Sequence, residues 1–155
     1  MAIGMVTYRD WQFEVERDVT SATYSDVAAG SADTCGCRDC QTYIAYRDKL
    51  FPPEVQELFG RLGVDYRKEV EITTFEEQPD GLNLIGGWFH FKGKIVSGKN
   101  CRIPTQAGDG FTLDLMNITE SFSIGFAASN DLTFFEDPTG LVQIEFMAHI
   151  PRLNT

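Results

Sequence analysis

Hydrophobic and polar residues alternate with a period of two near the N-terminus of this chain. Trp11, Phe13 and Val15 share one parity, and the residues between them are polar. Successive side chains of a β-strand point to opposite faces, so this alternation predicts a half-buried strand over residues 5–20. The small and polar residues 21–34 that follow predict a loop.

The period becomes helical over residues 38–63. A first helix over 38–50 presents one face with i, i+3, i+4 and i+7 spacing, which consists of Cys40, Tyr43, Ile44 and Arg47. Phe51-Pro52-Pro53 ends this helix, because a residue before proline is pushed out of the helical conformation. Gly63 suits the C-cap of a second helix, whose apolar stripe consists of Val55, Leu58, Phe59 and Leu62.

From residue 68 onward the period is two again. Gly86-Gly87 interrupts one apolar stretch and indicates a bulge or a close approach of two backbones. Gln78-Pro79-Asp80-Gly81 and Asp137-Pro138-Thr139-Gly140 are typical of turns. The predicted strands cover residues 69–74, 82–85, 88–96, 111–115, 122–126 and 141–150.

These elements predict an α+β fold with a mostly antiparallel β-sheet that forms a sandwich or partial barrel. The helical hairpin at about 38–63 would be inserted between strands and packed on one side or edge of the sheet. The chain of 155 residues is long enough to bury a core without disulfides, and 43% of its residues are hydrophobic. We therefore expect a single domain over residues 1–155.

The net charge of −10 limits the choice of partners. It repels phosphate backbones and anionic lipids, so we expect no nucleic-acid or membrane binding. The N-terminus lacks the pattern of a signal peptide, which favours a cytoplasmic location. Both parities are partly apolar in residues 132–135 and 144–147, so we expect leftover apolar surface and a homodimer. No pattern predicts a particular small-molecule ligand.

Three of the four cysteines, Cys35, Cys37 and Cys40, lie directly before the first predicted helix or in its first turn. Thiolates with Cys-x-Cys-x-x-Cys spacing can occupy three corners of a zinc tetrahedron. The unpaired N–H groups and the dipole at a helix N-terminus also favour the thiolate form. The sequence therefore predicts a zinc site formed by these three residues.

The fourth zinc ligand is less obvious. Cys101 is the best candidate, because it would supply a fourth thiolate. The alternatives are a water in an open site or another side chain, namely His90, Asp33 or His149. The cluster can also be interpreted as a redox pair, or as reduced thiols that only fill space.

A second candidate for chemistry is the strand face that carries Trp88, His90 and Lys92. Such a face can bind a ligand by stacking and hydrogen bonding, but polar side chains are also expected on the open face of a sheet. Neither His90 nor His149 has the neighbours of a catalytic triad or of a metalloprotease helix.

Three motifs occur together in the chain: Cys35-Gly36-Cys37-x-x-Cys40, Phe51-Pro52-x-Glu54 leading to Leu62-Gly63-Val64-Asp65, and Gly86-Gly87-Trp88-Phe89-His90-Phe91. In combination, over about residues 10–100, they resemble a family of small uncharacterised bacterial proteins. The resemblance implies a bacterial, single-domain protein, and it assigns no catalytic residue.

The functional hypothesis is therefore a structural zinc site in a binding or scaffolding domain. One rival is an enzyme that uses the cysteine cluster as a thiol redox centre, or as an open zinc site with His90 nearby. A second rival is a homo-oligomeric interaction module without a metal.

Overall fold

The computed structural model describes residues 3–152. Its helices are α1 (Arg17–Asp26), α2 (Ser31–Cys35), α3 (Arg38–Leu50) and α4 (Pro53–Leu62). Its strands are β1 (Gly4–Tyr8), β2 (Trp11–Val15), β3 (Glu71–Glu77), β4 (Leu82–Ser97), β5 (Arg102–Pro104), β6 (Phe111–Leu113), β7 (Met116–Thr119), β8 (Phe122–Ala127) and β9 (Leu141–Pro151). These four helices follow β2 and precede β3 in the chain.

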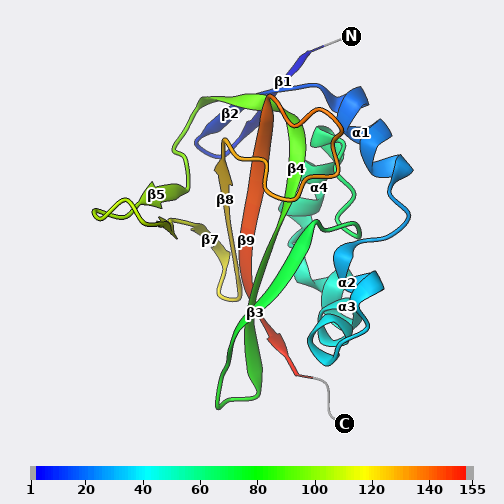
Figure 1. The fold of residues 1–155 in the computed structure, drawn as a ribbon, viewed down its shortest axis with the longest axis vertical. Helices are drawn as coiled ribbons and strands as arrows, with labels where there is room; N and C mark the ends of the chain where they lie inside the picture. Colours follow the sequence, from blue (N-terminus) through cyan, green and yellow to red (C-terminus); the bar gives the residue numbers. More distant parts are fainter. Residues whose placement is uncertain (1–2, 153–155) are drawn as a thin grey trace.

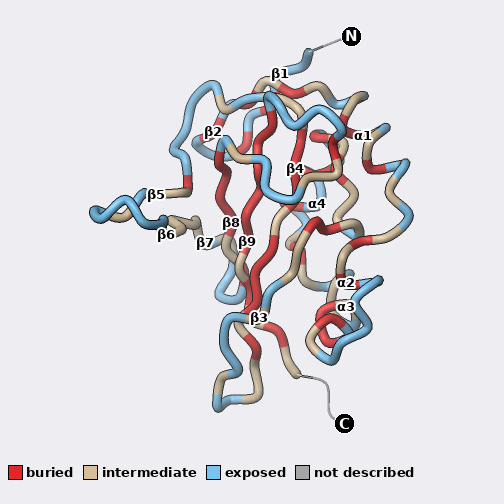
Figure 2. The backbone as a smooth tube through the Cα atoms, in the orientation of Figure 1, coloured by how far each residue is buried: buried red, intermediate tan, exposed pale blue. Residues whose placement is uncertain are grey.

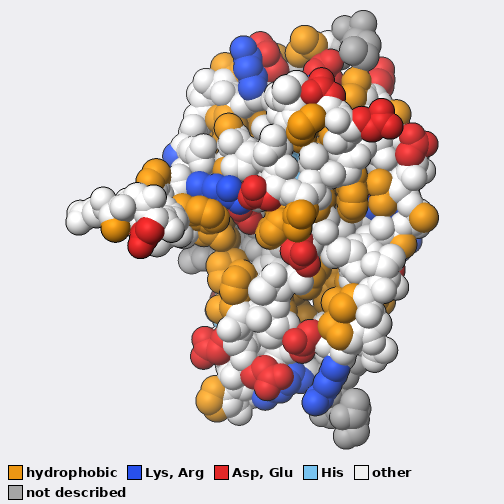
Figure 3. Space-filling model, viewed as in Figure 1, with side chains coloured by type: hydrophobic (Ala, Val, Ile, Leu, Met, Phe, Trp, Pro, Cys, Tyr) orange, Lys and Arg blue, Asp and Glu red, His pale blue; other side chains and the backbone are white. Residues whose placement is uncertain are grey.

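Seven strands form one antiparallel sheet in the order β1-β2-β4-β9-β8-β7, and β3 pairs with one half of the long strand β4. Strands β5 and β6 pair separately and project from the body as an arm, along which Figure 3 shows apolar side chains (Figures 1 and 3). The sheet curls enough to bring the rings of Phe13 and Phe126 within 4.8 Å, but it stays open between β1 and β7. The predicted α+β class with a mostly antiparallel sheet is therefore confirmed.

The hairpin of α3 and α4 lies against one face of the sheet, and the most buried backbone follows β4, β8 and β9 (Figures 1 and 2). Phe51, between the two helices, is central to this packing. Its ring centroid lies 5.2–5.8 Å from those of Phe59, Phe89, Phe122 and Phe146. The predicted apolar stripe of α4 is buried, and Gly63 ends the helix with a φ of 86°, as predicted.

The N-terminal part differs from the prediction of one strand over 5–20 and a loop over 21–34. The chain turns between β1 and β2 at Arg9, whose φ is 51°. Helices α1 and α2 occupy most of the segment that was expected to be a loop. Thr20 and Tyr24, one helical turn apart, are buried, and the Tyr24 hydroxyl donates to a backbone carbonyl of β4. Burial of this one side stabilises a helix whose small polar residues show little periodicity.

The glycine pair in β4 allows a close approach of two backbones rather than a bulge. The register between β4 and β9 runs through Gly86 and Gly87 without a shift. A Cβ on Gly87 would lie 2.2 Å from the carbonyl oxygen of Glu71, and a Cβ on Gly86 would lie 2.5 Å from the ring of Phe75. Strand β3 therefore needs glycine at both positions to reach β4.

We predict that Gly87→Ala destabilises the protein by about 1–3 kcal/mol, because the added methyl overlaps a backbone oxygen that cannot move without breaking the β3–β4 ladder. Urea denaturation measures the loss. Gly4→Ala is the matched control, because a Cβ on Gly4 meets nothing within 4 Å. Equal stability of the two variants would contradict the close approach.

Candidate metal centre

The cysteine cluster is built at the junction of two helices. Cys35 is the last residue of α2, Cys37 is the N-cap of α3, and Cys40 lies in the first turn of α3. Gly36, between the helices, has a φ of 71°, a conformation that glycine adopts without strain. The turn at Gly36 and the first turn of α3 thus bring the three side chains to one point.

The three sulfur atoms of this cluster lie within 4.8 Å of one another. A tetrahedral zinc ion with Zn–S bonds of about 2.3 Å places its sulfurs about 3.8 Å apart, so small side-chain rotations suffice to close the site. Cys35 and Cys37 are exposed, whereas Cys40 is buried. The cluster can therefore hold a metal ion at the protein surface, with one ligand anchored in the interior.

The two thiols of the Cys37-x-x-Cys40 pair differ in acidity. The backbone N–H of Cys40 donates to the sulfur of Cys37 at 3.3 Å, and this hydrogen bond lowers the pKa of Cys37 below its usual value. Burial raises the pKa of Cys40, because an anion is poorly solvated there. The exposed Cys37 is thus the thiol that ionises more easily.

Cys101, the best sequence candidate for a fourth ligand, is not brought to the cluster. It is buried beside β8, where a Cβ on Gly125 would lie 2.6 Å from the Cβ of Cys101. Its backbone N–H donates to the carbonyl of Phe126. Burial raises the pKa of its thiol to about 12, as expected for a packed cysteine. Period and spacing along the chain could not reveal this separation.

Two of the other candidate ligands are engaged elsewhere, and the third, His149, lies in β9 outside the cluster. His90 is fully buried, and its Nε2 lies 2.9 Å from the side-chain oxygen of Gln143. Asp33 accepts hydrogen bonds from Arg47 and from the backbone of Gly30. Among the described residues, no His, Cys, Asp or Glu joins the three cysteines as a fourth ligand within the same distance. The cluster therefore consists of three cysteines, two of which are exposed to solvent.

An ion-pair network that the sequence analysis missed holds the helices that carry the thiols. Arg47 of α3 donates to Asp33 of α2 at 3.0 Å, to the carbonyl of Arg67 at 3.1 Å, and to Glu69 at 3.4 Å. Glu69 is fully buried, and burial raises its pKa to about 7. Its backbone carbonyl accepts from the N–H of Ser31, at the start of α2. The sequence feature that could have revealed this network is Arg47, a charged residue on the predicted buried face of a helix.

The face of Trp88, His90 and Lys92 is covered by the chain segment 128–140. Trp88 donates to the carbonyl of Asp131, and Lys92 contacts the carbonyl of Thr139 and the carboxylate of Asp137. His90 reaches the same segment through Gln143, whose side-chain oxygen accepts from the backbone N–H of Asp131. These side chains therefore anchor a loop, and His90 lies apart from the thiols.

Comparisons with known proteins identify no relative of this chain. No protein-family model, curated protein or solved structure matches it. Among the described residues, no helix has the length and apolarity needed to cross a membrane.

We predict that His90 makes the folded state sensitive to acid. Burial lowers its pKa to about 4, so the unfolded chain binds more protons than the folded one between about pH 6.5 and pH 4. Stability should therefore fall as the pH falls through this window, by about 2–3 kcal/mol in total. The measurement is urea denaturation at pH 7 and pH 4.

The control variant for this measurement is His90→Gln. It lacks the titrating ring and keeps the other ionisable groups, including Glu69, so the difference between the two pH profiles isolates the histidine. Parallel profiles for the protein and the variant would show that His90 does not titrate in this way.

Proposed function

We propose that this protein binds one zinc ion through Cys35, Cys37 and Cys40 and leaves one coordination position free for water or for a ligand from another molecule. The proposal of a metal site rests on one observation: the three sulfur atoms lie within 4.8 Å of one another near the protein surface. Thiolates favour zinc and other thiophilic ions over Mg²⁺ and Ca²⁺. An open position is the arrangement that permits ligand exchange at the metal.

The bound ion would act locally on the fold. All three ligands come from a segment of six residues, Cys35 to Cys40, so the ion closes only a short loop of the unfolded chain. It would fix the angle between α2 and α3, which the Arg47 network already holds from the other end of α3. The large aromatic core under α4 does not depend on it. A scaffolding role of the zinc is thus confined to the α2–α3 junction.

We predict about one zinc per chain in protein purified without an affinity tag or added metal, measured by elemental analysis. Cys37→Ser should lose the metal, because two remaining sulfurs cannot hold zinc against the solvent. Cys101→Ser is the matched control and should keep it, because Cys101 is buried beside β8, where its backbone N–H donates to the carbonyl of Phe126. At about 100 times its dissociation constant, zinc should add about 2.7 kcal/mol to the unfolding free energy.

Two results would count against this proposal. Less than about a tenth of an equivalent of any transition metal, together with no binding of added zinc by the reduced protein, would exclude a metal function. Equal metal content of Cys37→Ser and the unchanged protein would place the metal elsewhere.

The second candidate function is thiol–disulfide exchange at Cys37 and Cys40. The observation that favours it is their position: Cys37 is exposed at the N-cap of α3, and Cys40 is buried one turn later. The Cys37 thiolate would attack a disulfide of a partner and expel one sulfur as thiolate. Cys40, after losing its proton, would then attack Cys37 and release the second sulfur. The pair becomes a disulfide as the partner gains two electrons and two protons.

We predict that the metal and redox functions separate in one experiment. If the metal function holds, bound zinc should protect all three clustered thiols from alkylation. After removal of the ion, Cys37 should be alkylated before Cys40, because the Cys37 thiol ionises more easily. Mass spectrometry after brief treatment with iodoacetamide identifies the modified residue. A Cys37–Cys40 disulfide that forms in glutathione buffer and persists in the presence of zinc would favour the redox function instead.

A further inference from the structure

The hydrogen bonds around Gln143 assign the protonation state of His90. The side-chain nitrogen of Gln143 lies 3.0 Å from a carboxylate oxygen of Glu145 and 3.3 Å from one of Asp131, and ionised carboxylates only accept. Its side-chain oxygen therefore faces the other way, where it accepts from the backbone N–H of Asp131 and lies 2.9 Å from Nε2 of His90. An amide oxygen cannot donate, so Nε2 of His90 carries the proton and Nδ1 carries a bare lone pair.

The bare Nδ1 of His90 has no hydrogen-bond partner in the described chain, and the side chain is fully buried. Acid would place an N–H group and a positive charge at this atom, where no protein group accepts the hydrogen bond. The charged groups nearby are Asp131, Glu145 of β9 and Arg102 of β5, and both carboxylates are already paired with the guanidinium. From α1, the hydroxyl of Tyr24 bonds only to the backbone of His90.

Residues 128–133, here called the Asp131 loop, pack over this histidine. Within the described chain, the hydrogen bonds from this loop to β4, β5 and β9 all involve Asp131, whose partners are Trp88, Arg102 and Gln143. Leu132, the next residue, is 70% exposed and has a φ of 49°, a left-handed conformation that is strained for residues other than glycine. The loop is therefore bonded to these strands at one residue, which lies next to a strained one.

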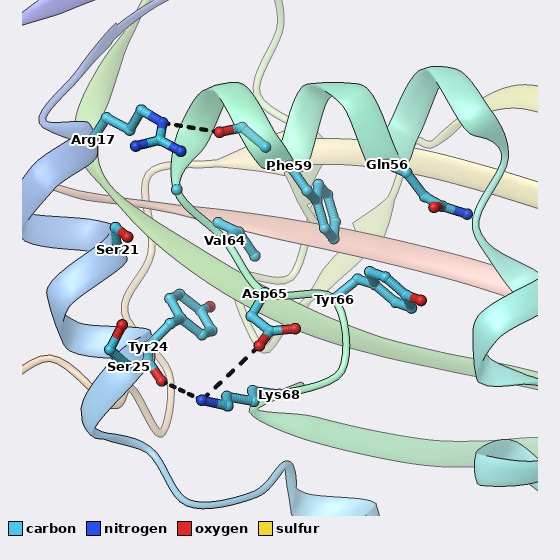
Figure 4. Close-up of a pocket in the computed structure, with 12 residues that line it drawn as sticks. Arg17, Ser21, Tyr24, Ser25, Gln56, Phe59, Val64, Asp65, Tyr66 and Lys68 are labelled. Atoms are coloured by element: carbon cyan, nitrogen blue, oxygen red, sulfur yellow. Dashed lines mark hydrogen bonds and ion pairs between the residues drawn. The ribbon is translucent and has the colours of Figure 1, made fainter.

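The chain that follows the loop is held by apolar packing instead. Phe134 and Phe135 lie edge-on to the ring of Tyr24 in α1, with centroid distances of 5.9 and 6.4 Å. The backbone of α1 is fixed separately, because Lys68 donates to the carbonyl of Tyr24 at 2.8 Å, as Figure 4 shows. None of these contacts uses the side chain of Asp131. They can therefore persist when the loop moves.

From this arrangement we infer that the Asp131 loop is an acid-sensitive latch. When the pH falls, His90 takes up a proton at Nδ1 as the loop moves away and water solvates the imidazolium, while the aromatic core stays folded. The rings that pack on the other face of β4 and β9, such as Phe89 and Phe146 around Phe51, carry no titrating group. Opening gives solvent access to the polar strand face that the loop covers.

The expected size of the effect follows from proton linkage. Burial lowers the pKa of His90 to about 4 under the closed loop, whereas a solvated histidine has a pKa of about 6.5, so the open form binds more protons between these values. The opening equilibrium should therefore rise about fiftyfold from pH 7 to pH 4.5. Asp131 acts only at lower pH, because the bonds from Arg102 lower its pKa even though burial opposes them. Glu145 has the opposite effect, because burial raises its pKa.

The test is amide hydrogen exchange of ¹⁵N-labelled protein at pH 7 and pH 4.5, corrected for the intrinsic pH dependence of exchange. Protection of the Asp131 amide should fall about fiftyfold, and at both pH values it should stay below about a tenth of the protection in the β4–β9 ladder. Low urea should accelerate exchange in the ladder but not at Asp131, because loop opening exposes little surface. Equal protection and equal urea dependence would show that the loop opens only with global unfolding, and would overturn the inference.

Variants separate a latch from a loop that is only structural. In His90→Gln, protection of the Asp131 amide should no longer depend on pH, because the titrating ring is gone. Trp88→Phe removes the indole bond to the Asp131 carbonyl, so it should lower protection about fivefold at both pH values and keep the pH dependence. Trp11→Phe is the matched control and should leave protection at Asp131 unchanged, because its indole donates to the carbonyl of Lys99.

Two results with these variants would also overturn the inference. One is an unchanged pH dependence of the Asp131 amide in folded His90→Gln. The other is equal protection of this amide in Trp88→Phe and in the unchanged protein. If His90→Gln fails to fold, Trp88→Phe and the pH profile of the unchanged protein decide.

Discussion

The pairing of β4 with β9 is the interaction on which the rest of the structure depends. Their ladder runs from Leu82 opposite Pro151 to Lys92 opposite Leu141, and other strands add to both sides of it. One face of the ladder is aromatic and receives α3 and α4. The other face is polar at His90 and Gln143 and receives the segment 128–140. Both faces are therefore covered, which explains how polar side chains come to be buried in a sheet.

The cysteine cluster depends on this core only indirectly. Helix α3 packs on the sheet through Tyr43, and the same helix presents Cys37 and Cys40 at its first turn. Arg47, near its other end, reaches Asp33 and Glu69 and so holds α2 in place. Because a buried carboxylate without its cation is costly, this network positions α2, and with it Cys35, before any metal binds.

Local patterns in the sequence were sufficient to predict two of the helices, the long strands and the cysteine cluster. The helical period with Phe51-Pro52-Pro53 and Gly63 located α3 and α4, and the two-residue period located the long strands. The cysteine spacing located the cluster of three thiols. These features follow from contacts between residues close in sequence, which periodicity records. Tertiary structure alone decided that α1 is a helix, that Cys101 is buried beside β8 rather than in the cysteine cluster, and that Glu69 is buried beside Arg47. Each of these depends on burial by residues distant in the chain, and a one-dimensional pattern carries no information about which surfaces meet.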